Sequence, residues 1–234
     1  MERWEWLLYA LMILPVLYGF GAYLVKRDSI RNIIIWGAAL TVIAGGIWLV
    51  VESLLVEGKI LTVEGGAGYS WIGFGLELAI LLVILAVAIR IRNVWIILFS
   101  ILQLGFAVGE RLLPAAEEAT MRYFYVDNLT RIMLLVTAVV GGIILIFSIG
   151  YMREHARHAP PTAGSLGRFF FFFISFLGFM VGVVVSNNLT LFSFFWEATT
   201  LCSYALIGQD GGNARRINAT RALLINSFGG VLLL

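Results

Sequence analysis

The stretch Leu189-Thr-Leu-Phe-Ser-Phe-Phe-Trp-Glu-Ala-Thr-Thr-Leu-Cys-Ser-Tyr-Ala-Leu-Ile-Gly208 decides the fold, because it is long enough to cross a membrane and carries a glutamate near its centre. A helix needs about 20 predominantly apolar residues to cross the hydrocarbon core. Eight residues of this stretch precede Glu197, which places the carboxyl group ~12 Å from the helix start, close to mid-membrane. A charge there costs at least ~2.5–3.5 kcal/mol, so it is expected to face protein or water and to have a function.

Hydroxyl groups accompany this glutamate along its helix. Ser193, Glu197 and Thr200 share one helix face, because they are spaced four and three residues apart. A carboxylate beside hydroxyls can be hydrated and can exchange protons. The alternative interpretation is a permanently protonated glutamate that makes a structural hydrogen bond between helices. Both interpretations place the side chain inside a helix bundle.

The composition of the whole chain agrees with a membrane protein. Hydrophobic residues make up 61% and charged residues 13%, about half of the roughly 25% typical of a soluble domain, so the outer surface is expected to face lipid. The net charge of +2 argues against nucleic-acid binding. One cysteine and two histidines cannot form a disulfide framework, an iron–sulfur cluster or a zinc site within this chain. We therefore expect no cofactor here, and any redox centre would belong to a partner.

Eight apolar segments approach the length of a membrane span, and together they predict an all-α integral membrane protein of about eight transmembrane helices. The segments are Leu7–Val25, Ile33–Val51, Trp71–Ile89, Val94–Gly109, Ile132–Met152, Phe169–Val185, Leu189–Gly208 and Ile217–Leu234. The glycine pairs Gly45-Gly46 and Gly141-Gly142 lie within spans, where small residues allow close helix approach. No nucleophile motif or nucleotide-binding loop is present, so we expect a non-catalytic subunit and leave open whether it serves an enzyme.

The distribution of basic residues predicts the orientation. The loops after the odd-numbered spans carry ten basic residues: Lys26, Arg27, Arg31, Arg90, Arg92, Arg153, Arg157, Arg168, Arg215 and Arg216. The opposite side carries five: Arg3, Lys59, Arg111, Arg122 and Arg131. By the positive-inside rule the odd-numbered loops are cytoplasmic, and the N-terminus lies outside.

Two further charges lie inside the predicted spans. Arg221, on the helix after Glu197, is a natural partner that could set the properties of the acid, although snorkelling to the cytoplasmic headgroups is an equal alternative. Glu77 lies about two turns into the third span, where we favour a structural role, either snorkelling or pairing with Arg122 or Arg131.

The remaining candidates lie at the ends of spans. Asp127 and Arg131 are four residues apart at the entry to the fifth span and are predicted to form a structural ion pair. His155 and His158 occupy a charged loop. They are expected to be ordinary surface residues, with proton collection at the cytoplasmic mouth as the alternative.

Several motifs in the second half resemble one known family. They are Tyr125-Val-Asp-Asn-Leu-Thr-Arg131, Ser148-Ile-Gly-Tyr-Met152, Asn188-Leu-Thr-Leu191, Phe195-Trp-Glu-Ala-Thr-Thr-Leu-Cys-Ser-Tyr-Ala-Leu-Ile-Gly208 and Ala219-Thr-Arg-Ala-Leu-Leu-Ile-Asn-Ser-Phe-Gly-Gly230. These motifs are similar to those of the antiporter-like subunits of respiratory complex I, energy-converting membrane-bound hydrogenases and Mrp-type cation/proton antiporters. The resemblance implies that Glu197 and Arg221 form a charged pair in a hydrated mid-membrane track and that protonation there is coupled to charge movement.

The resemblance also implies a division of the chain. Residues 1–115 are expected to hold the N-terminal transmembrane helices, with an apparent extra helix pair at residues 71–109. Residues 116–234 are expected to be the start of the antiporter-like proton-translocation domain, truncated at its C-terminus. The downstream lysine helix and the second half of the family fold do not follow in this sequence. We expect another membrane subunit to supply them.

Three functions follow from the resemblance. The first is a proton-translocating subunit of a hydrogenase-like or complex I-like redox assembly, in which partner subunits would hold iron–sulfur clusters or a nickel–iron centre. The second is a subunit of an Mrp-type antiporter that moves protons and, as an alternative ion, Na⁺. The third is a structural spacer that conducts nothing. In each case the expected location is the cytoplasmic membrane of a prokaryote, which the chain crosses several times.

Overall fold

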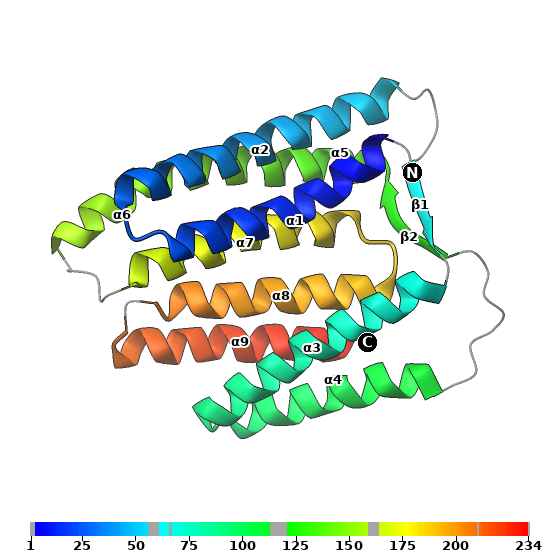
Figure 1. Cartoon of the computed structure of the whole chain (residues 1–234). Helices are drawn as coiled ribbons and strands as arrows, with labels where there is room; N and C mark the ends of the chain where they lie inside the picture. Colours follow the sequence, from blue (N-terminus) through cyan, green and yellow to red (C-terminus); the bar gives the residue numbers. More distant parts are fainter. Residues whose placement is uncertain are drawn as a thin grey trace. The chain divides into compact units, whose positions relative to one another are not determined.

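The computed structural model describes residues 3–55, 61–65, 67–112, 121–158, 164–209 and 211–233, and these residues are almost entirely helical (Figure 1). The helices are α1 (Arg3–Leu24), α2 (Asp28–Leu55), α3 (Ala67–Ile91), α4 (Val94–Leu112), α5 (Asn128–Leu135), the π-helical segment η1 (Val136–Val140), α6 (Gly141–His158), α7 (Ser165–Val185), α8 (Leu189–Ile207) and α9 (Asn213–Leu233). The strands β1 (Leu61–Gly65) and β2 (Met121–Val126) pair in a small sheet. The prediction of an all-α membrane protein is confirmed.

Among the described residues, six helical segments are long and apolar enough to cross a membrane. They are Trp4–Leu24, Asp28–Leu55, Gly68–Ile91, Val94–Leu112, Asn128–His155 and Ser165–Val185. The segment Asn128–His155 joins α5, η1 and α6. Helices α8 and α9 are not among the six, since α8 carries Glu197 and several hydroxyls and α9 carries three arginines. The predicted number of eight crossings and the outside position of the N-terminus stay predictions.

The chain folds into two compact units that interleave along the sequence. The first unit comprises Met1–Leu61, Val126–Val185 and Gln209–Gly211, and thus contains α1, α2, α5, η1, α6 and α7. The second unit comprises Thr62–Tyr125, Ser186–Gly208 and Gly212–Leu234, and thus contains α3, α4, α8 and α9. The sequence-based division at residues 115–116 stays a prediction.

Small residues determine the packing of the first unit, in which α1 lies against α2 and α7, and α2 lies against α6. A methyl group on Gly178 would lie 2.7 Å from the Met12 carbonyl oxygen, so α7 approaches the α1 backbone closely. A methyl group on Gly46 would overlap Ala138, and one on Gly142 would overlap Ile43. The close helix approach predicted for Gly46 and Gly142 is confirmed, and Gly178 is a further position of this kind.

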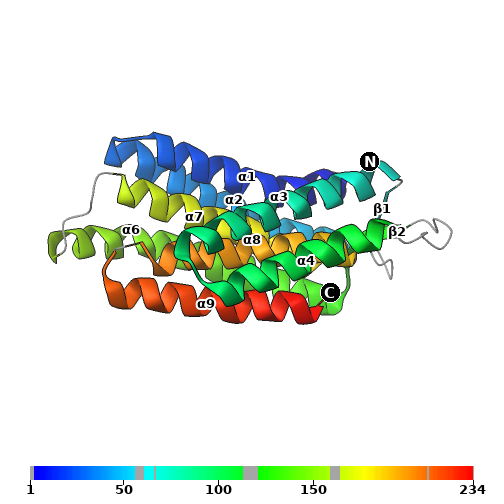
Figure 2. The same ribbon diagram turned by 90° about the horizontal axis from the view of Figure 1, so that it is seen from below.

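The second unit is a ring of four helices. Helix α3 packs against α4 and α8, and α9 packs against α8 and α4, so each helix has two neighbours (Figures 1 and 2). Polar caps fix where the helices begin: Asn188 accepts a hydrogen bond from the Leu191 N–H at the start of α8, and Asn93 accepts one from the Ile96 N–H at the start of α4. The interior of this ring contains the buried carboxyl groups described next.

Candidate functional site

Glu197 lies on α8 inside the second unit and is completely buried. Its Oε1 atom accepts a hydrogen bond of 2.6 Å from the Nε2 atom of Gln103, which lies on α4 and is also fully buried. Charged side chains are almost never fully buried unless they are paired. In the second unit the partner of this acid is therefore a neutral amide that comes from the helix pair 71–109.

Glu77 is the second carboxyl group of this interior. It lies on α3 and is 1% exposed. Its hydrogen-bonding neighbour is the hydroxyl of Ser193, which lies on α8 one turn before Glu197. The two carboxyls are close enough for their charges to interact. The structure thus places Glu77 inside the bundle, where it neither snorkels nor forms the expected pair with a basic residue at the outer side.

Several buried polar atoms have no protein partner among the described residues. In the second unit they are Glu77 Oε1, Gln103 Oε1, Trp196 Nε1, Glu197 Oε2 and Ser227 Oγ. Buried polar groups normally make hydrogen bonds to protein or ordered water, and an unsatisfied group costs about 1–3 kcal/mol. Such a cluster suits water molecules, a transferable proton or a small cation as additional partners. We call Glu77, Gln103, Ser193, Glu197 and Ser227 the carboxyl cluster.

Helix α9 closes the carboxyl cluster with a glycine. A methyl group on Gly230 would overlap both Gln103 Nε2 and Glu197 Oε1. The absence of a side chain therefore lets the α9 backbone cover the hydrogen bond between the two residues. Ser227 lies three residues earlier on the same face of α9, and its buried hydroxyl extends the polar surface along the helix. Residues of α4 and α9 thus contact the carboxyl group that Glu197 of α8 provides.

The polar face predicted on α8 is confirmed as a structural feature. Ser193 and Thr200 are each 2% exposed, and Glu197 is fully buried between them. These residues share one face because of the period of the helix, which is a local property. The part that each residue plays in ion movement stays a prediction.

Arg221 lies apart from the carboxyl cluster, and its expected contact with Glu197 is not formed. Gly230, not Arg221, is the α9 residue beside Glu197, and nine residues separate the two positions along the helix. At 1.5 Å per residue this is about 13 Å. Arg221 is exposed and lines a separate pocket at the other end of the bundle.

The expected ion pair between Asp127 and Arg131 is also not formed, since each residue binds a different part of the first unit. Asp127 is the N-cap of α5 and accepts a 2.7 Å hydrogen bond from the Thr130 N–H. Arg131 donates to the carbonyl oxygen of Ser53 (2.6 Å) at the end of α2 and to the side chain of Asn128 (2.7 Å). Asp127 thus stabilises the start of α5, and Arg131 connects α5 to the end of α2, which are structural roles.

The two histidines lie near the end of α6. His155 is half-exposed and its ring stacks on Tyr151, with ring centroids 6.0 Å apart. The side chain of His158 lies outside the described residues. Neither position belongs to the second unit. Proton collection by the pair stays a prediction.

Gln103 is the functional candidate that the sequence interpretation missed. The available signal was a glutamine and a serine, Ser100, in the otherwise apolar segment of α4, and both side chains are fully buried. The helix pair 71–109, whose purpose the sequence left open, supplies Glu77 and Gln103 to the site. No group of three or more His, Cys, Asp or Glu side chains suited to a metal ion occurs among the described residues.

Comparisons with known proteins identify relatives of the second half of the chain. Residues 120–160 match the family described as NADH-ubiquinone oxidoreductase (complex I), chain 5 N-terminus. Residues 186–234, which include Glu197, Ser227 and Gly230, match the family described as NADH:quinone oxidoreductase/Mrp antiporter, TM. The second half of the chain is an antiporter-like module of the complex I/Mrp family.

Curated relatives of this antiporter-like module include the Na(+)/H(+) antiporter subunit A1 of Staphylococcus haemolyticus, 33% identical over 111 residues. The same subunit of two Staphylococcus aureus strains, bovine RF122 / ET3-1 and JH9, is 32% identical over 111 residues. The alignment covers 47% of this chain and 13% of each of these relatives. The chain therefore spans only a small part of their length. No solved structure matches the chain.

Proposed function

We propose that this chain is a membrane subunit of an Mrp-type cation/proton antiporter and that Glu197 binds and releases the transported proton. The observation that carries the proposal is the carboxyl cluster, in which two buried glutamates have unpaired oxygen atoms inside a segment that matches the antiporter family. Ionisable residues inside membrane helices commonly mark ion paths and proton relays. The names of the curated relatives support the antiporter assignment.

The geometry suggests how a proton would move within the second unit. Gln103 donates to Glu197 Oε1 and fixes the carboxyl group, which leaves Oε2 to exchange a proton. The Ser193 hydroxyl neighbours Glu77 and lies one helical turn from Glu197, so it can accept a proton from one carboxyl while it donates to the other. We propose a relay from Glu77 through Ser193 to Glu197, with water completing the contacts.

The remaining translocation residues keep subordinate roles in this proposal. Thr200 extends the polar face beyond Glu197 and would hydrate it. Arg221 would act at long range, as a positive charge in the first half of α9, because it makes no contact with Glu197 among the described residues. Partner membrane subunits would complete the path, and the location proposed is the cytoplasmic membrane of a prokaryote.

A redox-driven assembly is the second candidate. It is favoured by the match of residues 120–160 to a family described from complex I. In that case the electron-transfer cofactors would belong to partner subunits, and the Glu197 relay would be the same. Copurification separates the two candidates: iron–sulfur or nickel–iron subunits support the redox assembly, and small membrane subunits alone support the antiporter.

The decisive test of the proton path is Glu197→Gln in the assembled complex. Glutamine keeps the size of the side chain and its hydrogen bonding to Gln103, but it cannot ionise. We expect normal assembly and cation/proton exchange reduced to the background level. The exchange is measured as cation uptake driven by a pH gradient in inverted vesicles. The matched control is Glu154→Gln, which removes an exposed glutamate paired with Arg157 on the surface and should transport normally.

One outcome contradicts the proposal. If Glu197→Gln assembles and transports protons at the wild-type rate, the carboxyl cluster is structural and the chain is a spacer. In that case proton uptake, measured with and without Na⁺, would be the same for Glu197→Gln and for the control Glu154→Gln.

A further inference from the structure

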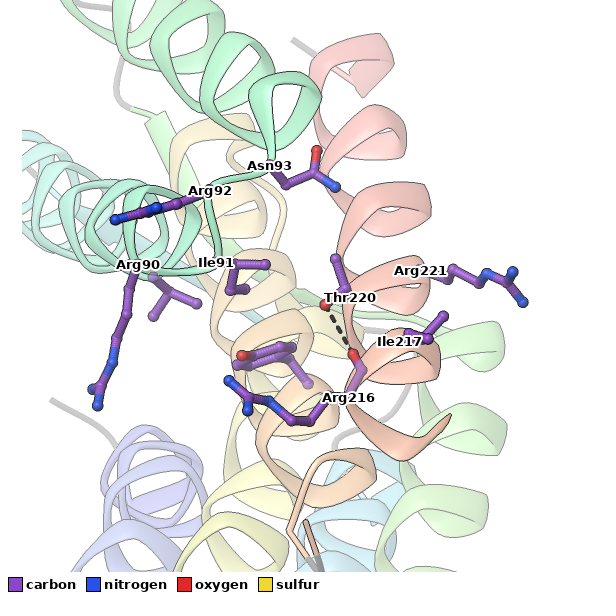
Figure 3. Close-up of a pocket in the computed structure, with 10 residues that line it drawn as sticks. Arg90, Ile91, Arg92, Asn93, Arg216, Ile217, Thr220 and Arg221 are labelled. Carbon is purple, nitrogen blue, oxygen red and sulfur yellow. Dashed lines mark hydrogen bonds between the residues drawn. The ribbon is translucent and has the colours of Figure 1, made fainter. Parts of the chain in front are cut away.

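A second polar site lies at the other end of the second unit. It is a cavity of about 720 Å³ lined by Val87, Arg90, Ile91, Arg92, Asn93, Tyr204, Arg216, Ile217, Thr220 and Arg221. These residues come from the α3–α4 turn, the end of α8 and the start of α9 (Figure 3). The volume falls within the ~300–1,000 Å³ range of small-molecule sites. We call this cavity the arginine pocket.

The arginine pocket is separate from the carboxyl cluster. Between them lie four completely buried apolar side chains, Ile84, Ala88, Ile96 and Leu223, which we call the apolar layer. Along α9 the order is Thr220 at the pocket, Leu223 in the layer and Ser227 in the carboxyl cluster. An anion in the pocket would therefore not touch the proposed proton relay.

The described lining residues of the pocket carry positive charges and no negative ones. Four arginines contribute to the lining, and the described lining residues include no aspartate or glutamate. None of the four makes an ion pair in the part of the chain that the structure describes. Guanidinium groups that border a cavity without an acidic partner attract anions through Coulomb interactions. The arrangement therefore favours an anionic ligand.

Arg92 occupies a backbone conformation that disfavours its side chain. Its φ of 60° makes it the one described non-glycine residue with positive φ. It follows α3 at the position where helices commonly end in a left-handed glycine, and any residue with a side chain is sterically disfavoured there. A glycine would make the same turn with less strain. The sequence nevertheless places an arginine at this turn, beside the pocket.

We propose that the arginine pocket binds the phosphate-bearing headgroup of an anionic membrane phospholipid. Arginine donates paired N–H groups that match phosphate oxygens, and Asn93 and Thr220 contribute polar atoms. Val87, Ile91 and Ile217 provide apolar surface for the glycerol and the first acyl carbons. The pocket lies where α3 ends and α4 begins, two helices long and apolar enough to cross a membrane, and basic pockets at the cytoplasmic ends of such helices bind these headgroups.

The arginines project in different directions, and this guides the choice of variants. Arg90 and Arg92 leave the α3–α4 turn, Arg216 extends from α9 toward the α3 side, and Arg221 points away from the turn (Figure 3). The Thr220 hydroxyl donates to the Arg216 carbonyl oxygen at 2.8 Å, which stabilises the first turns of α9. We choose Arg92 and Arg216 for replacement because they come from the two sides of the pocket, the α3–α4 turn and α9. Arg221 is left unchanged because of its proposed long-range role.

The test uses the full chain, purified with its partner subunits and reconstituted in nanodiscs. Phosphatidylcholine discs receive increasing fractions of cardiolipin or phosphatidylglycerol, and thermal unfolding and native mass spectrometry report bound lipid. Wild type is expected to gain thermal stability with anionic lipid. Arg92→Gly should unfold at the same or a higher temperature in phosphatidylcholine, since glycine suits the turn, but bind anionic lipid about fivefold more weakly.

The double variant Arg92→Gly, Arg216→Gln should lose more lipid affinity than the single variant. The control, Arg27→Gln with Arg153→Gln, removes the same charge from exposed arginines of the first unit and should bind as wild type does. Equal losses in control and pocket variants would overturn the proposal. A stability gain from inorganic phosphate alone, with no effect of anionic lipid, would assign the pocket to a soluble phosphate and also overturn it.

Discussion

The side chain that contacts Glu197 is the neutral amide of Gln103. When this glutamate ionises, its negative charge is therefore stabilised by hydrogen bonds and not by a basic side chain. Gln103 donates one hydrogen bond at 2.6 Å, and Glu197 Oε2 accepts none from the described protein groups. A carboxylate paired with arginine would remain fixed in its charged form over a wide pH range. A carboxyl group held by one amide can alternate between protonated and ionised states, as a relay requires.

The first prediction at the residue scale concerns Gly230. Gly230→Ala places a methyl group against Gln103 Nε2 and Glu197 Oε1 and should break their hydrogen bond. Gly229→Ala is the matched control, because its methyl group would meet only Trp196 Cζ2 at 3.7 Å. Both variants gain the same helix propensity. Relative to the control, Gly230→Ala should lose about 1–3 kcal/mol of stability.

The readouts for this pair of variants are thermal unfolding and proton uptake. Gly230→Ala should unfold at a lower temperature and transport more slowly than Gly229→Ala. Equal behaviour of the two variants would show that α9 does not cover the hydrogen bond as described.

At the scale of elements, the helices themselves were predictable and the contacts between them were not. Each span is an apolar run of about helical length, and that information is local. The partner of Glu197 lies 94 residues away in the sequence, on α4. Its identity depends on which helices pack together and at what register. The pairing of Arg221 with Glu197 failed for this reason, since a shift of nine residues along α9 separates them.

Another element-scale prediction concerns the N-cap of α5. The hydrogen bond from the Thr130 backbone N–H, helped by the Thr130 side chain, lowers the pKa of Asp127 below its usual value. A lowered folded pKa means that this group stabilises the fold above its unfolded pKa and that the contribution is lost as pH falls through the folded pKa. Asp127→Ala should cost about 0.5–2 kcal/mol at neutral pH.

Asparagine provides the control for this cap. Asp127→Asn keeps the capping oxygen at every pH, so it should retain stability at neutral pH and lack the acid-dependent loss of this group. Thermal unfolding of the three proteins between neutral and acidic pH compares them. The role assigned to Asp127 is wrong if alanine and asparagine unfold at equal temperatures.

At the scale of the whole molecule, the sequence predicted which loops lie on the same side of the membrane. The structure brings two of these basic segments, Arg90–Arg92 and Arg216, to one end of the second unit, as that prediction requires. The charge rule alone assigns that end to the cytoplasm.

Cysteine accessibility tests this orientation. Cys202 is the only cysteine of the chain and is buried, so the labelling background is low. In intact cells, a membrane-impermeant maleimide should label Leu112→Cys at the end of α4 but not Asn213→Cys at the start of α9. Both positions are exposed. The reverse labelling pattern would invert the predicted topology.

The apolar layer has a consequence for how the chain would respond to voltage. Ile84, Ala88, Ile96 and Leu223 form a dry dielectric, while water beside the carboxyl cluster would conduct. A transmembrane potential falls mainly across the poorly conducting part of its path, and one elementary charge crossing it exchanges about 2.3 kcal/mol per 100 mV. A proton that reached Glu197 from the Glu77 side would cross little of the field. Most of the electrical work would then be done in the step in which a charge crosses the apolar layer.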